Sequence, residues 1–461
     1  MIISVLAGLL VLCYNEAKKK ARTGIREGMM NENFLLKTKR AERLYFEAAA
    51  HLPIIDFHNH LCVADIKADR KYDNIVELWL APDPYKHRLM RICGVDEYYI
   101  TGAATPFEKF RKYCEVFPYL AGNPVYDWSR MELSLVFGIE ETINGENAKR
   151  IYDRANEMLA SPEFSANGIL SRFHIEYQSP VATLLEELSD FDGKRIAPSL
   201  RADDLLAPTE ELKRALAARS GVVISDEASY LRAVCVMLDR FSQKGCRFAD
   251  HSLDAGFFAD DTDGKRTEML VRLGVEYAKR GWTLLLHLNA KRHTSPRLRT
   301  LAGAAGGFAA AGEGFALSSL VDLLGRMETQ GGLPDTVLFP LNMSDQAPTA
   351  ILQGSFSQDG VPSKVQLGPA WWWCDHSMGI QNTLASVASF GAVSQFIGMT
   401  TDSRSILSFA RHDYFRRILC SWLDMQNTAG EWNLPFEIQA EFVKKISYQN
   451  AKEKTERGIL I

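Results

Sequence analysis

Short apolar runs that end in polar or charged residues recur along the chain, and each predicts a β-strand. Eight such runs occur, at residues 52–57, 173–177, 195–200, 246–249, 282–286, 336–341, 364–367 and 395–399. Amphipathic stretches with helical spacing separate them, most clearly at residues 209–219, 227–244, 266–280 and 317–330. Alternating strands and helices favour an α/β fold, and eight units predict a (β/α)8 barrel of the TIM type. The alternative, an open doubly wound sheet, has no G-x-G-x-x-G after a predicted strand to support it.

Three segments fall outside this alternation. Residues from about 74 to 165 separate the first two strands, look helical, and predict a helical insertion at the barrel mouth. Residues 301–314 are rich in Ala and Gly, which predicts a flexible loop, with a mobile lid as the alternative. Residues 1–28 are read as an N-terminal extension outside the fold. The rest, residues 29–461, is then a single barrel domain with its insertion.

Composition narrows the class of protein. The chain has 461 residues, of which 46% are hydrophobic and 24% charged, as is typical of a soluble globular protein. Its net charge of −4 excludes a bulk basic surface for nucleic acid. No apolar window is long enough to span a membrane. The eight cysteines are scattered without a C-x-x-C pair, which is typical of reduced thiols. We therefore expect a cytoplasmic protein with neither a nucleic-acid nor a membrane partner.

Candidate metal ligands follow three of the predicted strands. His58 and His60 close the first strand, and side chains at positions i and i+2 of a strand point the same way, so both imidazoles can face one metal ion. His287 ends the fifth strand and Asp402 follows the eighth. The strand ends of a barrel open on one face, where barrel active sites lie. Nitrogen and oxygen ligands suit zinc, with manganese, iron or cobalt as alternatives.

Histidines after strands one and five with an aspartate after strand eight resemble the metal pattern of the amidohydrolase superfamily. A closer resemblance, to the uronate isomerase family, runs from about Met30 to the end of the chain. DFHNHL at 56–61 is similar to that family's DFHCHL, and the longest similar block is SQFIGMTTDSRSILSFARHDYFRRILC at 394–420. Further blocks are NENFLLK at 31–37, NIVELWL at 74–80, YKHRLMR at 85–91, GVDEYYITG at 94–102, GNPVYDWSRMEL at 122–133, ADHSLD at 249–254 and LHLNAKR at 286–292.

The resemblance implies a reaction and a set of residues that carry it. Members of this family interconvert D-glucuronate with D-fructuronate and D-galacturonate with D-tagaturonate, by moving a proton from C2 to C1 through an enediol. His58, His60 and Asp402 would hold one divalent metal ion, with zinc expected. Asp402 would also carry the proton, Tyr85 would act at the C1–C2 oxygens, and Arg404 would stabilise the enediolate. The expected substrate-binding residues are Arg201, for the carboxylate, and Arg411, His412, His287 and Trp372. The partners expected are small sugar acids and further copies of the chain in a homo-oligomer.

Two other functions compete with isomerisation. One is a metal-dependent hydrolase of the same superfamily acting on a sugar lactone or amide, which would need a metal-bound water. The other is a non-catalytic binder of sugar acids. Departures from the family pattern, such as Pro84 and His87 flanking the Tyr85 motif and Gln178 after the second strand, leave the preferred uronate open. Asp250, His251 and Asp254 are interpreted as a hydrogen-bonded structural cluster.

Overall fold

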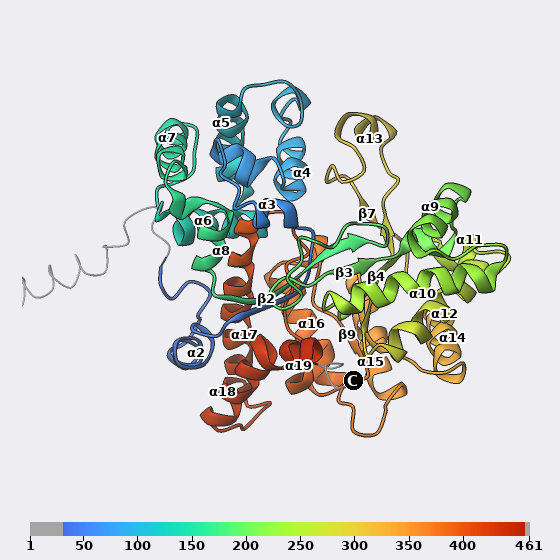
Figure 1. Cartoon of the computed structure of the whole chain (residues 1–461). Helices are drawn as coiled ribbons and strands as arrows, with labels where there is room; N and C mark the ends of the chain where they lie inside the picture. Colours follow the sequence, from blue (N-terminus) through green and yellow to red (C-terminus); the bar gives the residue numbers. More distant parts are fainter. Residues whose placement is uncertain (1–30, 457–461) are drawn as a thin grey trace, which may run out of the picture.

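The computed structural model describes residues 31–456, so the predicted extension at residues 1–28 lies outside the described residues. Seven strands form one sheet in the order β1-β2-β3-β4-β5-β8-β9, and every pair in it is parallel (Figure 1). The strands are β1 (Ile54–Asn59), β2 (Ile175–Thr183), β3 (Ser199–Arg201), β4 (Phe248–Leu253), β5 (Thr283–Leu288), β8 (Asp335–Pro340) and β9 (Val365–Leu367). A doubly wound sheet reverses its strand order at a switch point. The strictly sequential order excludes that alternative and gives a parallel half-barrel.

The strand predicted at residues 395–399 does not form. Val393–Gln395 is a short 3-10 helix, and residues 396–402 have no regular secondary structure. Side chains take two backbone N–H groups that a strand would use in its ladder: Ile397 donates to Gln366 Oε1 and Thr401 donates to Asp56 Oδ1. The apolar run therefore predicted burial correctly, but the backbone of this segment bonds to side chains on its neighbouring strands.

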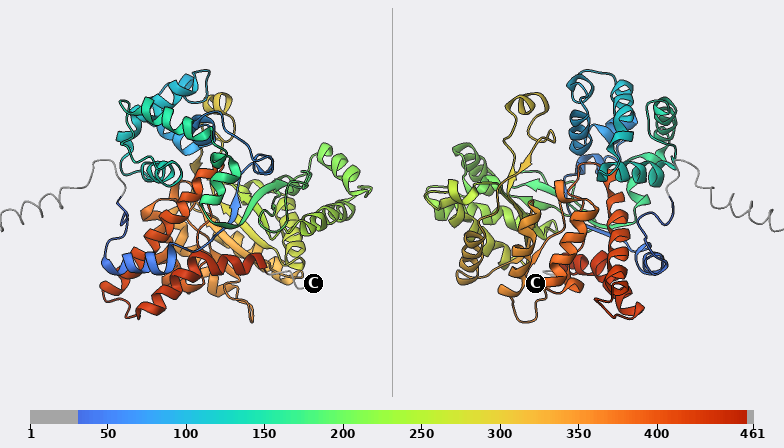
Figure 2. Two further views of the ribbon diagram at one scale, coloured as in Figure 1. Left: turned by 60° about the vertical axis from the view of Figure 1, so that its left-hand side comes forward. Right: turned by 180° about the vertical axis from the view of Figure 1, so that it is seen from behind.

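Helices cover the outer face of the sheet (Figure 2). They are α9 (Glu210–Ser220), α10 (Glu227–Gln243), α12 (Lys265–Lys279), α14 (Leu317–Thr329), α15 (Gln346–Ser355), α16 (Ser377–Phe390) and α17 (Ala410–Thr428). Near the two ends of the described chain, α2 (Lys39–Leu44), α18 (Phe436–Lys444) and α19 (Asn450–Glu456) pack together at the opposite end of the molecule from the insertion (Figure 1). All four helical stretches predicted from periodicity are confirmed within one or two residues at each end.

The insertion is helical, as predicted. Its main helices are α4 (Pro84–Ile92), α5 (Pro106–Val116), α6 (Pro124–Phe137), α7 (Ala148–Leu159) and α8 (Ala166–Arg172). Prolines begin three of these helices, at Pro84, Pro106 and Pro124, because proline at the first helical position loses no hydrogen bond. The preceding residues Asp83, Thr105 and Asn123 cap them through side-chain oxygens.

An arm follows β5 and rises beside the insertion (Figure 1). We define this arm as residues 290–311; it contains β6 (Ala290–Lys291), α13 (Pro296–Ala302) and β7 (Ala310–Ala311), with β6 and β7 paired antiparallel. Its tip touches α4, because Arg88 donates to the carbonyls of Gly307 and Ala309. The Ala- and Gly-rich stretch is therefore part of a structured arm and not only the loop that its composition predicts.

The described chain bears on two expectations from composition, which concern membrane spans and disulfides. None of the helices in residues 31–456 combines the length and the apolar character that crossing a membrane requires. The seven cysteines of the same range are all free thiols, in agreement with the absence of a disulfide framework.

Candidate active site

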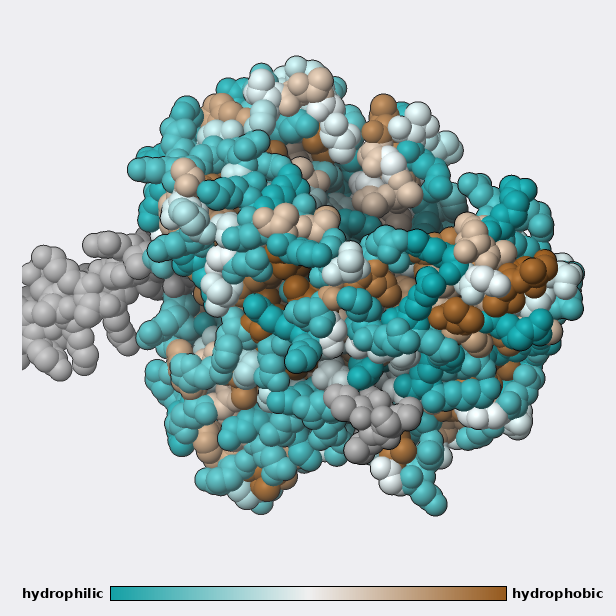
Figure 3. Space-filling model, viewed as in Figure 1, coloured by the Kyte–Doolittle hydropathy of each residue, from teal (hydrophilic) through white to brown (hydrophobic). Residues whose placement is uncertain are grey.

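A cavity of about 480 Å³ opens at the carboxyl ends of the strands, between the sheet, the insertion and the arm. Its surface is hollowed between the helices of the insertion and the arm in Figure 3. The strand-end residues on its wall are His58, His60, Val181, Ala182, Thr183, Arg201 and His287. The insertion adds Pro84 and Tyr85, the segment after β9 adds Trp371, Trp372 and Trp373, and the C-terminal part adds Asp402, Ser403 and Arg404. This is the face on which parallel barrels carry their active sites.

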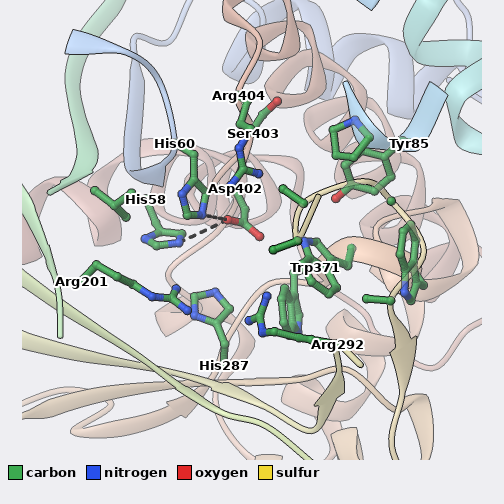
Figure 4. Close-up of a pocket in the computed structure, with 18 of the residues that line it drawn as sticks. His58, His60, Tyr85, Arg201, His287, Arg292, Trp371, Asp402, Ser403 and Arg404 are labelled. Atoms are coloured by element: carbon green, nitrogen blue, oxygen red, sulfur yellow. Dashed lines mark ion pairs between the residues drawn. The ribbon is translucent and has the colours of Figure 1, made fainter. Parts of the chain in front are cut away.

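His58, His60 and Asp402 converge at one point of the cavity (Figure 4). Oδ1 of Asp402 lies 3.3 Å from Nε2 of His58 and 3.1 Å from Nε2 of His60. The backbone brings the segments together, since the Asp402 N–H donates to the His58 carbonyl and the His60 N–H donates to the Ser403 carbonyl. Asp402 has a φ of 46°, in the left-handed region that non-glycine residues rarely adopt. Such strain is concentrated at functional sites, where the surroundings impose it.

The electrostatics of this cluster favour an ionised carboxylate. Burial by itself raises the pKa of Asp402, but the imidazoles of His58 and His60 beside it hold that pKa well below its usual range. The pKa of His60 is lowered, chiefly by burial. Burial also opposes charge on His58, yet the nearby carboxylates of Asp250 and Asp402 raise its pKa. The cluster therefore pairs one negative oxygen with two imidazole nitrogens at hydrogen-bonding distance.

The donor set fits a divalent metal ion. His58 is fully buried, and neither of its ring nitrogens makes a regular hydrogen bond, which is costly unless another partner takes the lone pair. One ligand atom from each of His58, His60 and Asp402 lies within 4.8 Å of the others. Two imidazoles and a carboxylate match the ligands that zinc takes in catalytic sites. The predicted cluster is thus brought together by the fold.

His58 also lies in a second cluster with Asp250 and His287, but there a cation would meet a positive charge. Asp250 is fully buried, and its carboxylate pairs with the Arg201 guanidinium. The other oxygen of Asp250 lies 2.7 Å from Nδ1 of His287. Burial disfavours the Asp250 carboxylate, but the charge of Arg201 keeps its pKa well below the usual range. Asp250 therefore acts as an anion shared by two cavity residues.

Nε2 of His287 is buried without a hydrogen-bond partner, and the ring lines the cavity. The ring is packed between the rings of Phe339, at a centroid distance of 4.5 Å, and Trp371, at 4.6 Å. Its Nδ1 faces Asp250, so Nε2 is the nitrogen left for a ligand. His287 is thus at the site, as predicted.

Tyr85 reaches the cavity from the first turn of α4, where Asp83 caps the helix. Its hydroxyl is buried without a partner, and its ring meets those of Trp128 and Trp373 edge-on at 5.6 Å. Burial raises the pKa of Tyr85 far above its usual value, so the phenol keeps its proton at neutral pH. Tyr85 is therefore a hydrogen-bond donor that faces the same space as Asp402.

The remaining predicted residues fall into two groups. Arg201, Arg404 and Trp372 line the cavity, as expected. Arg411 and His412 do not line it, because each is buried against other protein groups. The Arg411 guanidinium lies 4.9 Å from the centre of the Tyr85 ring and 3.4 Å from Asp375, whereas His412 lies 3.3 Å from Asp56. Arg411 therefore contacts the cavity residue Tyr85 without lining the cavity, and His412 contacts Asp56 of β1.

Sequence reasoning assigned Asp250 to a structural cluster with His251 and Asp254. The three side chains instead have separate partners: Asp250 binds Arg201 and His287, His251 Nε2 lies 3.0 Å from Tyr277 Oη, and Asp254 binds Arg292. The arm contributes further cavity residues that the sequence analysis did not assign, namely Arg292, His293 and Arg299. The position of Asp250 directly after a predicted strand was the one signal that pointed to the site.

A parallel α/β sheet with two histidines and one carboxylate at its carboxyl edge defines a protein of the amidohydrolase type, with a group of residues that could hold a metal ion. The family model for glucuronate isomerase matches residues 26–267 and 259–454. The chain therefore belongs to the glucuronate isomerase family, and the prediction that it is an isomerase is confirmed.

Individual relatives are similar in sequence to this chain over nearly its whole length. The uronate isomerase of Caldanaerobacter subterraneus is 36% identical over 92% of this chain and 98% of its own, and that of Oceanobacillus iheyensis is 34% identical over 94% and 98%. The crystal structure of uronate isomerase from Thermotoga maritima superposes with a TM-score of 0.84 at 26% identity, covering 92% of this chain and 99% of that one.

Proposed function

We propose that the cavity isomerises hexuronates, D-glucuronate to D-fructuronate and D-galacturonate to D-tagaturonate, by transferring a proton from C2 to C1 of the open-chain sugar. The observation that carries this proposal is the convergence of Asp402, Tyr85 and Arg404 on one cavity of a uronate isomerase fold. A carbon acid next to a carbonyl loses its proton faster when a base takes the proton and an electrophile stabilises the oxygen that gains charge. The cavity offers both kinds of group.

Asp402 is the proposed proton carrier. Its Oδ1 faces the two histidines, and Oδ2 remains to take the proton from C2 and return it to C1. Electrons from the broken C2–H bond form the C1–C2 double bond of the enediol, while the C1 carbonyl oxygen takes up negative charge or a proton. Tyr85, which keeps its proton, donates to that oxygen, and Arg404 neutralises the charge that develops on it. The proton of the C2 hydroxyl passes to the C1 oxygen, relayed by Tyr85, whose own protonation is unchanged overall. When Asp402 then returns its proton to C1, the C1 oxygen is a hydroxyl and C2 is the ketone.

We propose zinc as the metal ion held by His58, His60 and Asp402. A divalent cation there would supply positive charge to fix oxygens of the sugar acid. His287 would accept a hydrogen bond from a sugar hydroxyl through Nε2, and Trp372 would give the sugar an apolar wall. Arg201 would donate to the sugar acid through the N–H groups that Asp203 and Asp250 leave free.

We also propose that the segment of residues 396–403 takes the place of an eighth strand and completes the barrel. Backbone hydrogen bonds to His58 of β1 and from His60 just after it, and one from the Ile397 N–H to the Gln366 side chain of β9, support this closure. Sugar acids as the only ligands, a homo-oligomeric state and a cytoplasmic location remain predictions. Light scattering of the purified protein measures the oligomeric state.

Turnover of D-glucuronate and D-galacturonate by the purified protein tests the proposed function. We expect ketose formation, and the Asp402→Asn variant should lose about 10²- to 10⁴-fold in kcat, as is typical for a lost acid–base group. Metal analysis and circular dichroism of that variant separate loss of the proton carrier from loss of metal or fold. Hydrolysis of a sugar lactone without ketose formation would favour the hydrolase alternative. Assays with and without a chelator measure the dependence on metal.

A further inference from the structure

Arg411 and Arg416 are the two buried arginines of residues 31–456, and both lie on α17. The N–H groups of Arg416 donate to the backbone carbonyls of Leu52 and Pro53. Arg411, which is only 1% exposed, faces side chains of the insertion instead. A buried charge is unfavourable unless its neighbours stabilise it, so the neighbours of Arg411 indicate what its charge does.

The Arg411 guanidinium lies over two aromatic rings of the insertion. Its central carbon is 4.9 Å from the centre of the Tyr85 ring and 4.1 Å from that of the Trp128 ring. The two rings meet edge-on, with their centres 5.6 Å apart. The face of an aromatic ring attracts a cation, and more strongly where water is excluded. Arg411 does not line the cavity, so it acts on the Tyr85 ring from within the protein.

The same guanidinium is bonded to the segment that carries Asp402. Its Nη1 donates to the carbonyl of Thr401, the residue before Asp402, at 3.2 Å. Nη1 also lies 3.4 Å from the buried carboxylate of Asp375, and Nη2 donates to Oγ of Ser408 at 3.5 Å. The guanidinium is planar and rigid. One rigid group therefore connects the Tyr85 ring to the backbone next to Asp402.

We propose that Arg411 is a positioning residue of the isomerisation, which fixes the Tyr85 phenol relative to the Asp402 carboxylate and stabilises the phenol oxygen while it relays a proton. The inference rests on the proposed function, because it concerns the two groups that move protons there. Figure 4 shows Tyr85 and Asp402 facing the same space. Burial raises the pKa of Tyr85, and the positive charge of Arg411 is the main influence that opposes this rise.

A positioning residue of this kind affects the reaction steps and not the binding of substrate. Arg411 is not at the cavity surface, so the sugar acid makes no contact with it. Moving a reacting group by about 1 Å can lower a rate about 10²-fold. A displaced Tyr85 would therefore lower kcat and kcat/KM by the same factor, whereas KM would stay near its wild-type value.

The test compares Arg411→Lys with Arg416→Lys by steady-state kinetics on D-glucuronate. Lysine keeps the charge but not the planar fork that reaches the ring and the carbonyl together. Arg416 is buried on the same helix, so it is a matched control for the loss of a buried guanidinium. We expect kcat of Arg411→Lys to fall about tenfold to hundredfold with KM nearly unchanged. Arg416→Lys should keep both constants, and equal losses of kcat in the two variants would overturn the proposal.

A double-mutant cycle shows whether Arg411 acts through Tyr85. Tyr85→Phe keeps the ring and removes the hydroxyl, so nothing is left for Arg411 to position. Adding Arg411→Lys to Tyr85→Phe should therefore lower kcat by less than about threefold. Losses that multiply independently would overturn the proposal, because they would place the effect of Arg411 on another group.

Circular dichroism and thermal unfolding of each variant measure its fold. If Arg411→Lys does not fold, Asp375→Asn takes its place in the cycle, because it keeps the guanidinium and removes the carboxylate that faces it. We expect Asp375→Asn to lower kcat about threefold to tenfold, and this loss should disappear in the Tyr85→Phe background. A loss that persists there, or no loss at all, would overturn the proposal.

Failure of the proposed function is seen separately, since the wild-type protein would then form no ketose from D-glucuronate or D-galacturonate. Carbon NMR of the protein labelled at the phenol carbon of tyrosine then decides whether Arg411 acts on Tyr85. The Tyr85→Phe variant identifies the Tyr85 signal. Arg411→Lys should shift that signal and Arg416→Lys should not, and an unshifted signal in Arg411→Lys would overturn the inference.

Discussion

Asp250 connects two cavity residues that come from different strands. Its carboxylate pairs with Arg201 at the end of β3 and with Nδ1 of His287 at the end of β5, and it is itself fully buried. The bond to Nδ1 determines which nitrogen of His287 faces the cavity. Asp250 is thus a positioning residue that acts on the substrate through its two neighbours.

The Asp250→Asn substitution should lower kcat/KM about tenfold to a hundredfold, because it removes a charged hydrogen-bond acceptor from two site residues. An amide can present its NH2 to His287 and reverse the imidazole tautomer, which nitrogen NMR of the ring detects. Circular dichroism and thermal unfolding provide the control for fold. A variant with unchanged kcat/KM and the wild-type tautomer would contradict this positioning role.

At the scale of elements, the insertion contains a buried cluster of charged side chains. Nζ of Lys86 on α4 lies 2.5 Å from Asp83 and 3.0 Å from Glu132 on α6, and all three side chains are buried. The Trp79 indole N–H also donates to Glu132. A buried cation between two carboxylates couples the two helices, and α4 in turn holds Tyr85.

Lys86→Met should therefore destabilise the protein by about 3–5 kcal/mol, since it leaves two buried carboxylates without their cation. Urea unfolding measures the change. Lys213→Met is the matched control, because Lys213 forms the same i,i+3 pair with a carboxylate, Glu210, on the surface of α9. The control should change stability by no more than about 0.5 kcal/mol. Similar values for the two variants would show that the buried triad is not a stabilising contact.

At the scale of the whole molecule, Asp56 joins the first strand to the C-terminal part of the chain. Its fully buried carboxylate accepts hydrogen bonds from the Thr401 N–H and from the hydroxyls of Thr400 and Thr401. His412 lies 3.3 Å from the same carboxylate. These contacts place Asp402 beside His58, although the two residues are far apart in sequence.

Burial opposes ionisation of Asp56, but His412 and the hydrogen bonds lower its pKa overall. A lowered pKa stabilises the fold above the unfolded value of about 3.9. That stability is lost as the pH falls through the folded pKa. The Asp56→Asn variant should therefore be less stable than the wild type by about 1–3 kcal/mol at pH 7, and this difference in the free energy of unfolding should become smaller at acid pH. Urea unfolding at several pH values measures this, with the exposed Asp153→Asn as a control. The same difference in stability at every pH would contradict this role of the Asp56 carboxylate.

The periodicity of the chain determined most of the elements by itself. Strands form at seven of the eight predicted positions, and all four predicted helices form. The spacing of apolar residues that predicts these elements is a local property of the sequence. The eighth predicted strand, at residues 395–399, does not form. The side chain of Gln366, which is remote in sequence, accepts from the backbone N–H of Ile397, and just beyond that segment Asp56 accepts from the N–H of Thr401. Local patterns do not contain such partners.

The residues of the candidate site likewise fall into those that the sequence identifies and those that only the structure identifies. Sequence motifs were enough to identify five of its residues, because a motif consists only of residue types and their order along the chain. These residues are His58, His60, Tyr85, Asp402 and Arg404. Only the tertiary structure decided that Asp250 is shared by Arg201 and His287, that the Arg411 guanidinium lies over the Tyr85 ring, and that Arg299 of the arm lines the cavity. Each of these facts depends on which charges meet across different strands and helices, and that is settled by packing in three dimensions.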